Sequence, residues 1–213
     1  MRIWVIAFVG LVLAGCSAAS VTGPSASAVA SASAAPAASA TTSPTTATVA
    51  STISSCAAPA QAITELTEGP YYKAGAPQRA TLSATGVAGT PLVLTGYVLS
   101  TSCQPIANAK LDFWQADGNG SYDNSGYTLR GWQLTDANGA YRLETVIPGL
   151  YPGRTEHIHV KVTVNGKTYT SQLFFPGVSQ NAGDSIYAAN MLIALNSATS
   201  TPRTGTFNFI ISI

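Results

Sequence analysis

Charged residues are scarce in this sequence, and so are histidine and cysteine. Of 213 residues, 10 are basic and 9 acidic, with a formal net charge of +1, and the chain contains 3 cysteines and 2 histidines. No cluster of Lys and Arg occurs, so nothing indicates a nucleic-acid partner. The sequence also lacks a G-x-S-x-G nucleophile motif, a phosphate-binding glycine loop and a C-x-x-C pair, which excludes the enzyme classes that depend on them.

The first residues have the features of an export signal. Arg2 precedes an apolar stretch at residues 3–13, which is shorter than the roughly 20 residues that cross a bilayer as a helix. The Leu-Ala-Gly-Cys motif that ends at Cys16 resembles a bacterial lipobox, in which the cysteine is acylated. We therefore expect residues 1–16 to be a lipoprotein signal peptide, and the protein to be exported and membrane-anchored on the extracytoplasmic side through its lipid alone. An ordinary secretory signal is the alternative.

Residues 17–55 contain no charged and no aromatic side chain. They are mostly Ala, Ser and Thr with a few prolines, so they have little apolar surface to bury, and we expect a disordered tether. The composition changes near Cys56, where we place the start of one folded domain, residues 56–213. Cys56 and Cys103 are the cysteines left once Cys16 is set aside, and in an exported protein we expect them to form a disulfide.

The folded part consists of short apolar or alternating runs separated by turn residues. Residues 136–139 and the pair Asn165-Gly166 are typical turn sequences. Residues 186–196 predict a short helix or a loop that covers one end. Short strands at this spacing predict an all-β fold, a β-sandwich of short, mostly antiparallel strands with little helix. The predicted strands are residues 92–99, 110–115, 141–146, 157–164, 168–175 and 207–213.

The two histidines are separated by a single residue, in His157-Ile158-His159. The β-branched run that follows predicts a strand, on which residues i and i+2 point to the same side, about 7 Å apart at the Cα atoms. Both imidazoles can therefore reach one metal ion. A pair of partly exposed surface histidines is the alternative for an isolated motif of this kind, so other residues must supply further ligands.

Two tyrosines are candidates for those ligands. Tyr151 lies in a turn rich in Pro and Gly just before the histidines, and Tyr122 follows a predicted strand. Phenolate oxygen is a hard ligand, and with imidazole nitrogen it suits ferric iron better than a soft metal. Packing is the alternative for each tyrosine. Residues 117–123 resemble a calcium loop, but Tyr122 stands where that loop needs Gly and Thr128 where it needs Glu, so a polar turn is expected there.

The order of the motifs is similar to that of the intradiol ring-cleavage dioxygenases, a family that includes the catechol and protocatechuate dioxygenases and a group of short exported relatives. The resemblance covers residues 67–175, nearly all of the folded part. The matching motifs, in chain order, are residues 68–72 (EGPYY), 111–117 (LDFWQAD), 120–122 (GSY), 129–131 (LRG), 135–141 (TDANGAY), 145–151 (TVIPGLY), Arg154, residues 157–159 (HIH) and 171–175 (SQLFF).

The resemblance implies a metal site, catalytic residues and a substrate pocket. The implied cofactor is non-haem Fe(III), with four ligands: Tyr122, Tyr151, His157 and His159. The implied catalytic residues are Arg154 beside the substrate, Tyr151, which the substrate displaces from the metal, and Gln172 next to the metal ligands. The residues implied to line the substrate pocket are Gly69, Pro70 and Tyr71.

The implied reaction is the opening of a catechol-type aromatic diol between its two hydroxylated carbons, with both atoms of O2 incorporated into a muconate-type diacid. The implied partners are therefore a small aromatic diol and O2. Thr155-Glu156 replaces the family's usual Pro-Ala before the first histidine, and the resemblance specifies neither the particular diol nor the oligomeric state. The rival interpretation is a transthyretin-like sandwich that acts as a surface binding module without a catalytic metal.

Overall fold

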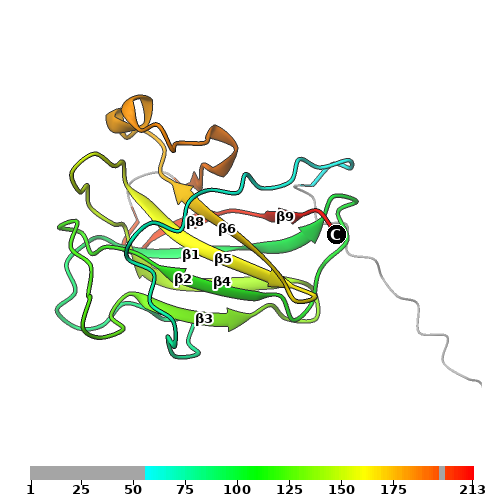
Figure 1. The fold of residues 1–213 in the computed structure, drawn as a ribbon, viewed down its shortest axis with the longest axis horizontal. Helices are drawn as coiled ribbons and strands as arrows, with labels where there is room; N and C mark the ends of the chain where they lie inside the picture. Colours follow the sequence, from blue (N-terminus) through cyan, green and yellow to red (C-terminus); the bar gives the residue numbers. More distant parts are fainter. Residues whose placement is uncertain (1–55, 197–199) are drawn as a thin grey trace, which may run out of the picture. The chain divides into compact units, whose positions relative to one another are not determined.

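The structure is a computed structural model, which describes residues 56–196 and 200–213. The expected signal peptide, the acylation site Cys16 and the tether lie outside these residues. Within the described ranges, nine strands and two short 3-10 helices follow one another along the chain, and the strands form two sheets (Figure 1). The prediction of an all-β sandwich with little helix is confirmed.

The first sheet has four antiparallel strands and carries the two histidines. Its order is β3-β2-β5-β6. The strands are β3 (Arg130–Leu134), β2 (Lys110–Trp114), β5 (His157–Val164) and β6 (Lys167–Phe174). The turn between β5 and β6 is Asn165-Gly166, with φ of 50° and 80°, the left-handed conformation that a two-residue hairpin of type I′ requires.

The second sheet has five strands and includes the C-terminal segment. Its order is β4-β1-β8-β7, and β9 also pairs with β1. The strands are β4 (Ala140–Val146), β1 (Pro91–Ser100), β8 (Arg203–Thr206), β7 (Ala194–Leu195) and β9 (Phe209–Ile211). The pairs of β1 with β8 and with β9 are parallel, and the other pairs are antiparallel, so the expectation of mostly antiparallel strands is correct.

The side chains of β5 alternate between the hydrophobic core and the outer face of the sheet, where the two histidines lie. Ile158, Val160 and Val162 are fully buried in the core cluster. His157 and His159 point to the opposite side of the sheet, because successive strand residues alternate. They are nevertheless only 2% and 1% exposed, since loops cover this outer face of the sheet.

Strands β3, β7 and β8 were not predicted, because their sequences contain few β-branched apolar residues. In β3, Gly131 weakens the strand signal, yet a Cβ there would lie 2.7 Å from Leu82 Cδ2 and 2.8 Å from Arg79 Cγ, so these side chains would have to shift to admit a larger residue. The predicted strand at residues 207–213 is shorter than expected. Its first residues form a break between β8 and β9, where Tyr97 N–H donates to Asn208 Oδ1 at 3.1 Å.

The segment that follows β6 is mainly an extended loop, which is one of the two predicted alternatives. The 3-10 helices η1 (Ser179–Gly183) and η2 (Ala189–Met191) lie in the orange segment of Figure 1. A longer helix at residues 186–196 is not formed, because Ile193 N–H donates to Phe174 O and thereby extends the chain along β6. Within the described ranges, no helix is long and apolar enough to cross a membrane.

The predicted disulfide between Cys56 and Cys103 is confirmed, with a Cα–Cα distance of 5.8 Å. It joins the beginning of the described chain to the turn that follows β1. The polar turn predicted at residues 117–123 is also present, since the Asp117 carboxylate accepts hydrogen bonds from the N–H groups of Asn119 and Ser121.

Candidate metal centre

The two histidines of β5 bring their Nε2 atoms to a distance of 3.0 Å from each other. His157 Nδ1 lies 2.6 Å from Thr155 O, and because a carbonyl oxygen can only accept, Nδ1 carries the proton and Nε2 has a free lone pair. Burial lowers the pKa of His157 to about 4, although its hydrogen bond to Thr155 opposes this shift. Burial and the neighbouring His157 also hold the pKa of His159 well below its usual value. Both rings are therefore neutral, as metal ligands require.

Two glycine-containing loops bring the tyrosines to the histidines. Gly149 N–H donates to Asp117 O, and a Cβ on Gly120 would lie only 2.0 Å from Leu150 O. Only glycine permits backbones to approach so closely. As a result, the ring centroids of Tyr122 and Tyr151 lie 5.8 Å apart.

Both tyrosines lie next to the histidine pair. Tyr151 Oη lies 3.3 Å from His157 Nε2, and the ring of Tyr122 lies 6.4 Å from that of His159. Burial raises the pKa of Tyr122. Burial also raises the pKa of Tyr151, although the Arg154 guanidinium opposes that shift. A nearby cation would be needed to hold either group as a phenolate.

The buried atoms around this point fit a metal ion. Tyr122 Oη is buried without a hydrogen-bond partner in the described part of the chain, although buried polar atoms are normally paired. A metal ion held by His157 and His159 would accept the lone pairs of both Nε2 atoms and of the phenol oxygens. Residues 56–196 and 200–213 contain no cluster of three or more His, Cys, Asp or Glu that could hold a metal. A metal ion at this point would therefore need the two phenols in addition to the two imidazoles. Hard oxygen with imidazole nitrogen suits ferric iron.

Arg154 lies beside the four ligand candidates, the two tyrosines and the two histidines. Its Nε donates to Asp184 Oδ2 at 2.9 Å, its Nη1 lies 3.3 Å from Tyr151 Oη, and its Nη2 donates to Gln172 Oε1. Gln172, which pairs with His159 across β5 and β6, donates to Thr67 O. Arg154 and Gln172 therefore both lie next to the ligand candidates. Asp184 was not predicted, because nothing in its local sequence distinguishes it.

The predicted substrate-pocket residues border the same point. A Cβ on Gly69 would lie 3.4 Å from His159 Cε1, so this glycine keeps space open next to a ligand candidate. Tyr71 stacks on Tyr122 with centroids 4.2 Å apart and an interplanar angle of 15°, and it presents its edge to Tyr151. Pro70 and Tyr71 line a cavity of about 490 Å³. Another cavity, of about 480 Å³, borders Tyr151 and Arg154.

Trp114 is a further neighbour that the sequence did not reveal. It pairs with His159 across β2 and β5, and the two rings stack in parallel with centroids 4.8 Å apart. The indole is 1% exposed. Its flat face therefore limits the orientation of the His159 imidazole, and the cross-strand register that produces this contact becomes visible only when the sheet order is known.

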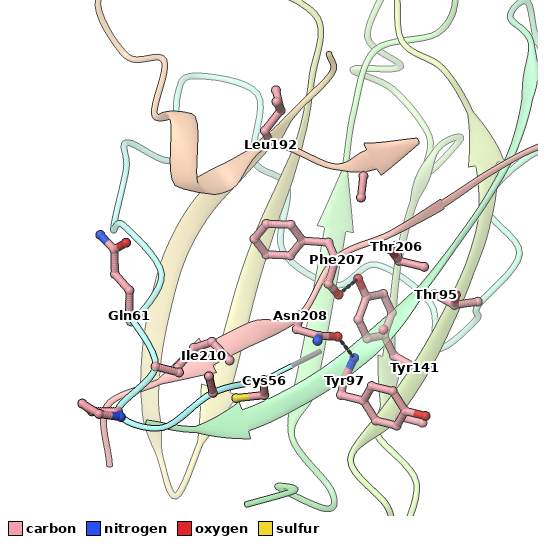
Figure 2. A pocket seen from close by; sticks show the side chains of 16 residues that line it. Cys56, Gln61, Thr95, Tyr97, Tyr141, Leu192, Thr206, Phe207, Asn208 and Ile210 are labelled. Atoms are coloured by element: carbon pink, nitrogen blue, oxygen red, sulfur yellow. Dashed lines mark hydrogen bonds between the residues drawn. The ribbon is translucent and has the colours of Figure 1, made fainter. Parts of the chain in front are cut away.

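A cavity of about 830 Å³ lies apart from this centre. Figure 2 shows Tyr97, Tyr141, Phe207 and Asn208 around it. None of its lining residues is charged, and none is a candidate ligand, catalytic residue or predicted substrate-pocket residue. The concentration of imidazole, phenol and guanidinium groups on the outer face of β5, rather than the size of a cavity, identifies the candidate site.

Comparison with known sequences shows the family of this chain. The family model described as "Dioxygenase" matches residues 67–211. Catechol 1,2-dioxygenase of Acinetobacter baylyi is 28% identical over 151 residues, covering 57% of this chain and 49% of that protein. The protocatechuate 3,4-dioxygenase beta chain of Burkholderia cepacia is 31% identical over 118 residues, covering 46% and 50%. The chain thus spans about half the length of the curated relatives that it matches.

Solved structures of dioxygenases are also similar to this chain. The dioxygenase domain of a dioxygenase carbohydrate-binding protein fusion from Streptomyces sp. SirexAA-E is 42% identical with a TM-score of 0.69, covering 72% of this chain and 99% of that one. An intradiol ring-cleavage dioxygenase from Tetranychus urticae is 26% identical with a TM-score of 0.64, covering 70% and 92%. Fold and site together define an all-β dioxygenase domain. The chain belongs to the intradiol ring-cleavage dioxygenase family.

Proposed function

We propose that this protein is a non-haem ferric dioxygenase that opens catechol-type aromatic diols between the two hydroxylated carbons. Both atoms of O2 enter the product, a muconate-type diacid. The observation that supports this proposal best is the convergence of two imidazoles and two phenols on one buried point, with the Nε2 atoms of His157 and His159 3.0 Å apart. When bound there, ferric iron supplies the Lewis acidity that makes the diol ring reactive toward O2.

The residues around that point have distinct tasks in the proposed reaction. Tyr151 Oη lies between His157 Nε2 and the Arg154 guanidinium, both at 3.3 Å, where as a phenolate it can accept a proton from a diol hydroxyl. Arg154 faces the place where the substrate becomes negatively charged, and a fixed cation stabilises such charge best in a site without water. Tyr71 supplies an aromatic wall, and Gly69 leaves room next to His159.

A visible absorption spectrum with oxygen-uptake measurements tests the proposal. The iron-loaded domain should be coloured through charge transfer from tyrosinate to Fe(III), and it should consume O2 when catechol is added. Tyr151→Phe should shift the visible band and reduce turnover while the fold persists, because a ring of almost the same size remains. His157→Ala should lose both iron and colour.

Arg154→Ala provides the contrasting result, because arginine is not a ligand: the colour should persist while ring cleavage slows. A domain that stays colourless and iron-free after iron reconstitution, with no oxygen uptake on catechols, would contradict the proposal. That outcome would favour the transthyretin-like binding module instead.

We also propose that the enzyme acts outside the cytoplasm, anchored to a membrane by a lipid on Cys16. The disulfide between Cys56 and Cys103 supports this location, since stable disulfides are characteristic of oxidising compartments. The uncharged sequence at residues 17–55 would serve as a spacer between the anchor and the domain.

A further inference from the structure

Arg130, the first residue of β3, is a buried cation that forms no ion pair with a carboxylate among the described residues. It is 1% exposed, and none of the ion pairs among the described residues includes it. A buried charge is costly unless hydrogen bonds or other charges compensate for it. Its neighbours therefore indicate why an arginine is kept at this position.

The compensation comes from two loops that border the candidate metal centre. Arg130 Nη1 donates to Tyr71 O at 2.6 Å, and Arg130 Nε donates to Asp123 O at 3.1 Å. The first carbonyl belongs to the aromatic wall of the substrate pocket. The second belongs to the residue that directly follows the ligand candidate Tyr122. The guanidinium also lies 5.8 Å from the centroid of the Tyr122 ring, within reach of a cation–π contact.

The backbone before Arg130 is held in an unfavourable conformation. Leu129 has a φ of 55°, a left-handed value that is rare for a bulky residue. Such conformations persist where the surrounding structure requires them, often at functional sites. Here the left-handed residue directly precedes the residue whose side chain reaches both loops.

We propose that Arg130 is a positioning residue that sets the substrate wall at Tyr71 and the ligand Tyr122 relative to each other. Neither Tyr71 nor Tyr122 is linked to β3 by another side chain in the contacts above, while their two rings stack on each other at 4.2 Å. Arg130 ties the backbones of both loops to one strand through a single rigid fork of N–H donors. This inference rests on the proposed function, because the two positioned groups belong to the proposed substrate pocket and metal centre.

Arg79 provides a matched control within the same region. Its side chain donates to Tyr127 O and Arg130 O, so it stabilises the same loop and the start of β3 through carbonyl oxygens. It contacts neither Tyr71 nor Tyr122 in these hydrogen bonds. A variant at Arg79 therefore reports the loss of a structural arginine without loss of the proposed positioning.

The test compares Arg130→Met, Arg130→Lys and Arg79→Met with the wild-type protein. In the iron-loaded enzyme, Arg130→Met should raise the KM for catechol by roughly tenfold, as expected for the loss of a hydrogen bond to a charged donor, and it should shift the visible band. Arg130→Lys should keep the charge near Tyr122 but cannot reach both carbonyls, so KM should remain raised and the band should still be shifted, which separates positioning from charge. Arg79→Met should lower the melting temperature and leave KM and the band unchanged.

Hydrogen exchange in the iron-free protein separates this inference from the proposed function. Arg130→Met should accelerate exchange at residues 68–73 and 122–126, whereas Arg79→Met should accelerate it only near residues 127–131. If Arg130→Met only lowers the melting temperature, as Arg79→Met does, with KM, the band and both loops unchanged, the positioning role is wrong. If wild-type protein neither binds iron nor consumes O2 with catechol, the proposed function fails, and the exchange comparison still decides whether Arg130 positions the two loops.

Discussion

At the scale of single residues, the candidate centre depends on polar side chains that are buried and hold one another in place. Asp184 accepts hydrogen bonds from the backbone N–H groups of Thr155 and Ile186 and from Arg154. Burial raises the pKa of Asp184, but these hydrogen bonds outweigh it, so that the net shift is downward. Asp184 is therefore ionised at neutral pH and fixes the direction of the Arg154 guanidinium.

Asp184→Asn tests this orientation. The variant removes the charge that holds Arg154 Nε at 2.9 Å, and we expect kcat/KM for catechol to fall by roughly tenfold or more, the usual effect of losing a charge-assisted hydrogen bond. The visible band should persist, because Asp184 contacts none of the ligand candidates. Glu144→Gln, in the exposed ion pair with Arg142, is the control and should leave kcat/KM unchanged. Equal activity of both variants would show that Asp184 does not orient Arg154.

Asp112 provides a prediction on pH and stability. Burial raises the pKa of Asp112, although Lys110 and a hydrogen bond from the Tyr72 hydroxyl oppose the shift. Because the pKa in the folded state is higher than in the unfolded state, the group stabilises the fold below the unfolded pKa, and this stabilisation is lost as the pH rises through the folded pKa.

The comparison of Asp112→Asn with wild type measures this loss. The variant cannot ionise at this position, so it does not lose this stabilisation. As the pH rises from 3 to 7, the free energy of unfolding of wild type should therefore fall relative to that of the variant. Urea titrations at several pH values provide these free energies. A difference that stays constant across this range would contradict the predicted shift.

At the scale of secondary-structure elements, the β5–β6 hairpin determines how the ligand candidate His159 lies relative to Gln172. His159 pairs with Gln172 across the two strands. A slip of one residue would turn every side chain to the other face of the sheet. The Asn165-Gly166 turn, in which both residues have positive φ, therefore contributes to the site although it lies at the far end of the hairpin.

Gly166→Ala should destabilise the domain by about 1–2 kcal/mol, the cost of a left-handed residue that carries a Cβ. A Cβ at this position meets nothing within 4 Å, so the effect would be purely conformational. Gly183→Ala is the matched control, because its Cβ also meets nothing and its φ is not positive. We expect that variant to be as stable as wild type or slightly more stable. Equal unfolding free energies for the two variants would contradict the assigned turn.

The disulfide ties the beginning of the domain to the turn that follows β1. Cys56 and Cys103 are 47 positions apart, and the chain-entropy model assigns a loop of this length a stabilisation of roughly 4 kcal/mol. The double variant Cys56→Ser/Cys103→Ser should lose up to this amount in urea unfolding, and reduced wild-type protein should behave in the same way. A loss below about 1 kcal/mol would show that the unfolded chain is already restricted without the bond.

At the scale of the whole molecule, the proposed lipid anchor decides where the enzyme works. Cys16 lies outside the described residues, so cell fractionation is the appropriate measurement. The wild-type protein should sediment with membranes, whereas Cys16→Ala should be released from them or stay unprocessed. Ser17→Ala, one residue further along, is the control and should behave as wild type. Normal processing and unchanged membrane association of Cys16→Ala would rule out the anchor.

Much of the site could be predicted because its chemistry is concentrated in short motifs. His157 and His159 share a face for any strand at that position, and Tyr122, Tyr151, Arg154 and Gln172 stand in the order that the family resemblance implies. The strands β1, β2, β4, β5 and β6 also followed from their alternation. Strands β3, β7 and β8 did not. β7 has only two residues, a glycine or polar residues interrupt the pattern in β3 and β8, and only pairing with neighbouring strands makes them part of a sheet.

The sequence by itself determined the features that depend on neighbouring residues: the period-two strands, the Asn165-Gly166 turn and the shared face of the two histidines. Only the tertiary structure decided which distant groups complete the centre. Asp184 is 30 positions from Arg154, and Arg130 is 59 positions from the Tyr71 carbonyl that it binds. No local pattern encodes such contacts, because they arise from the order of strands in the sheets and from loops that cross the outer face of β5.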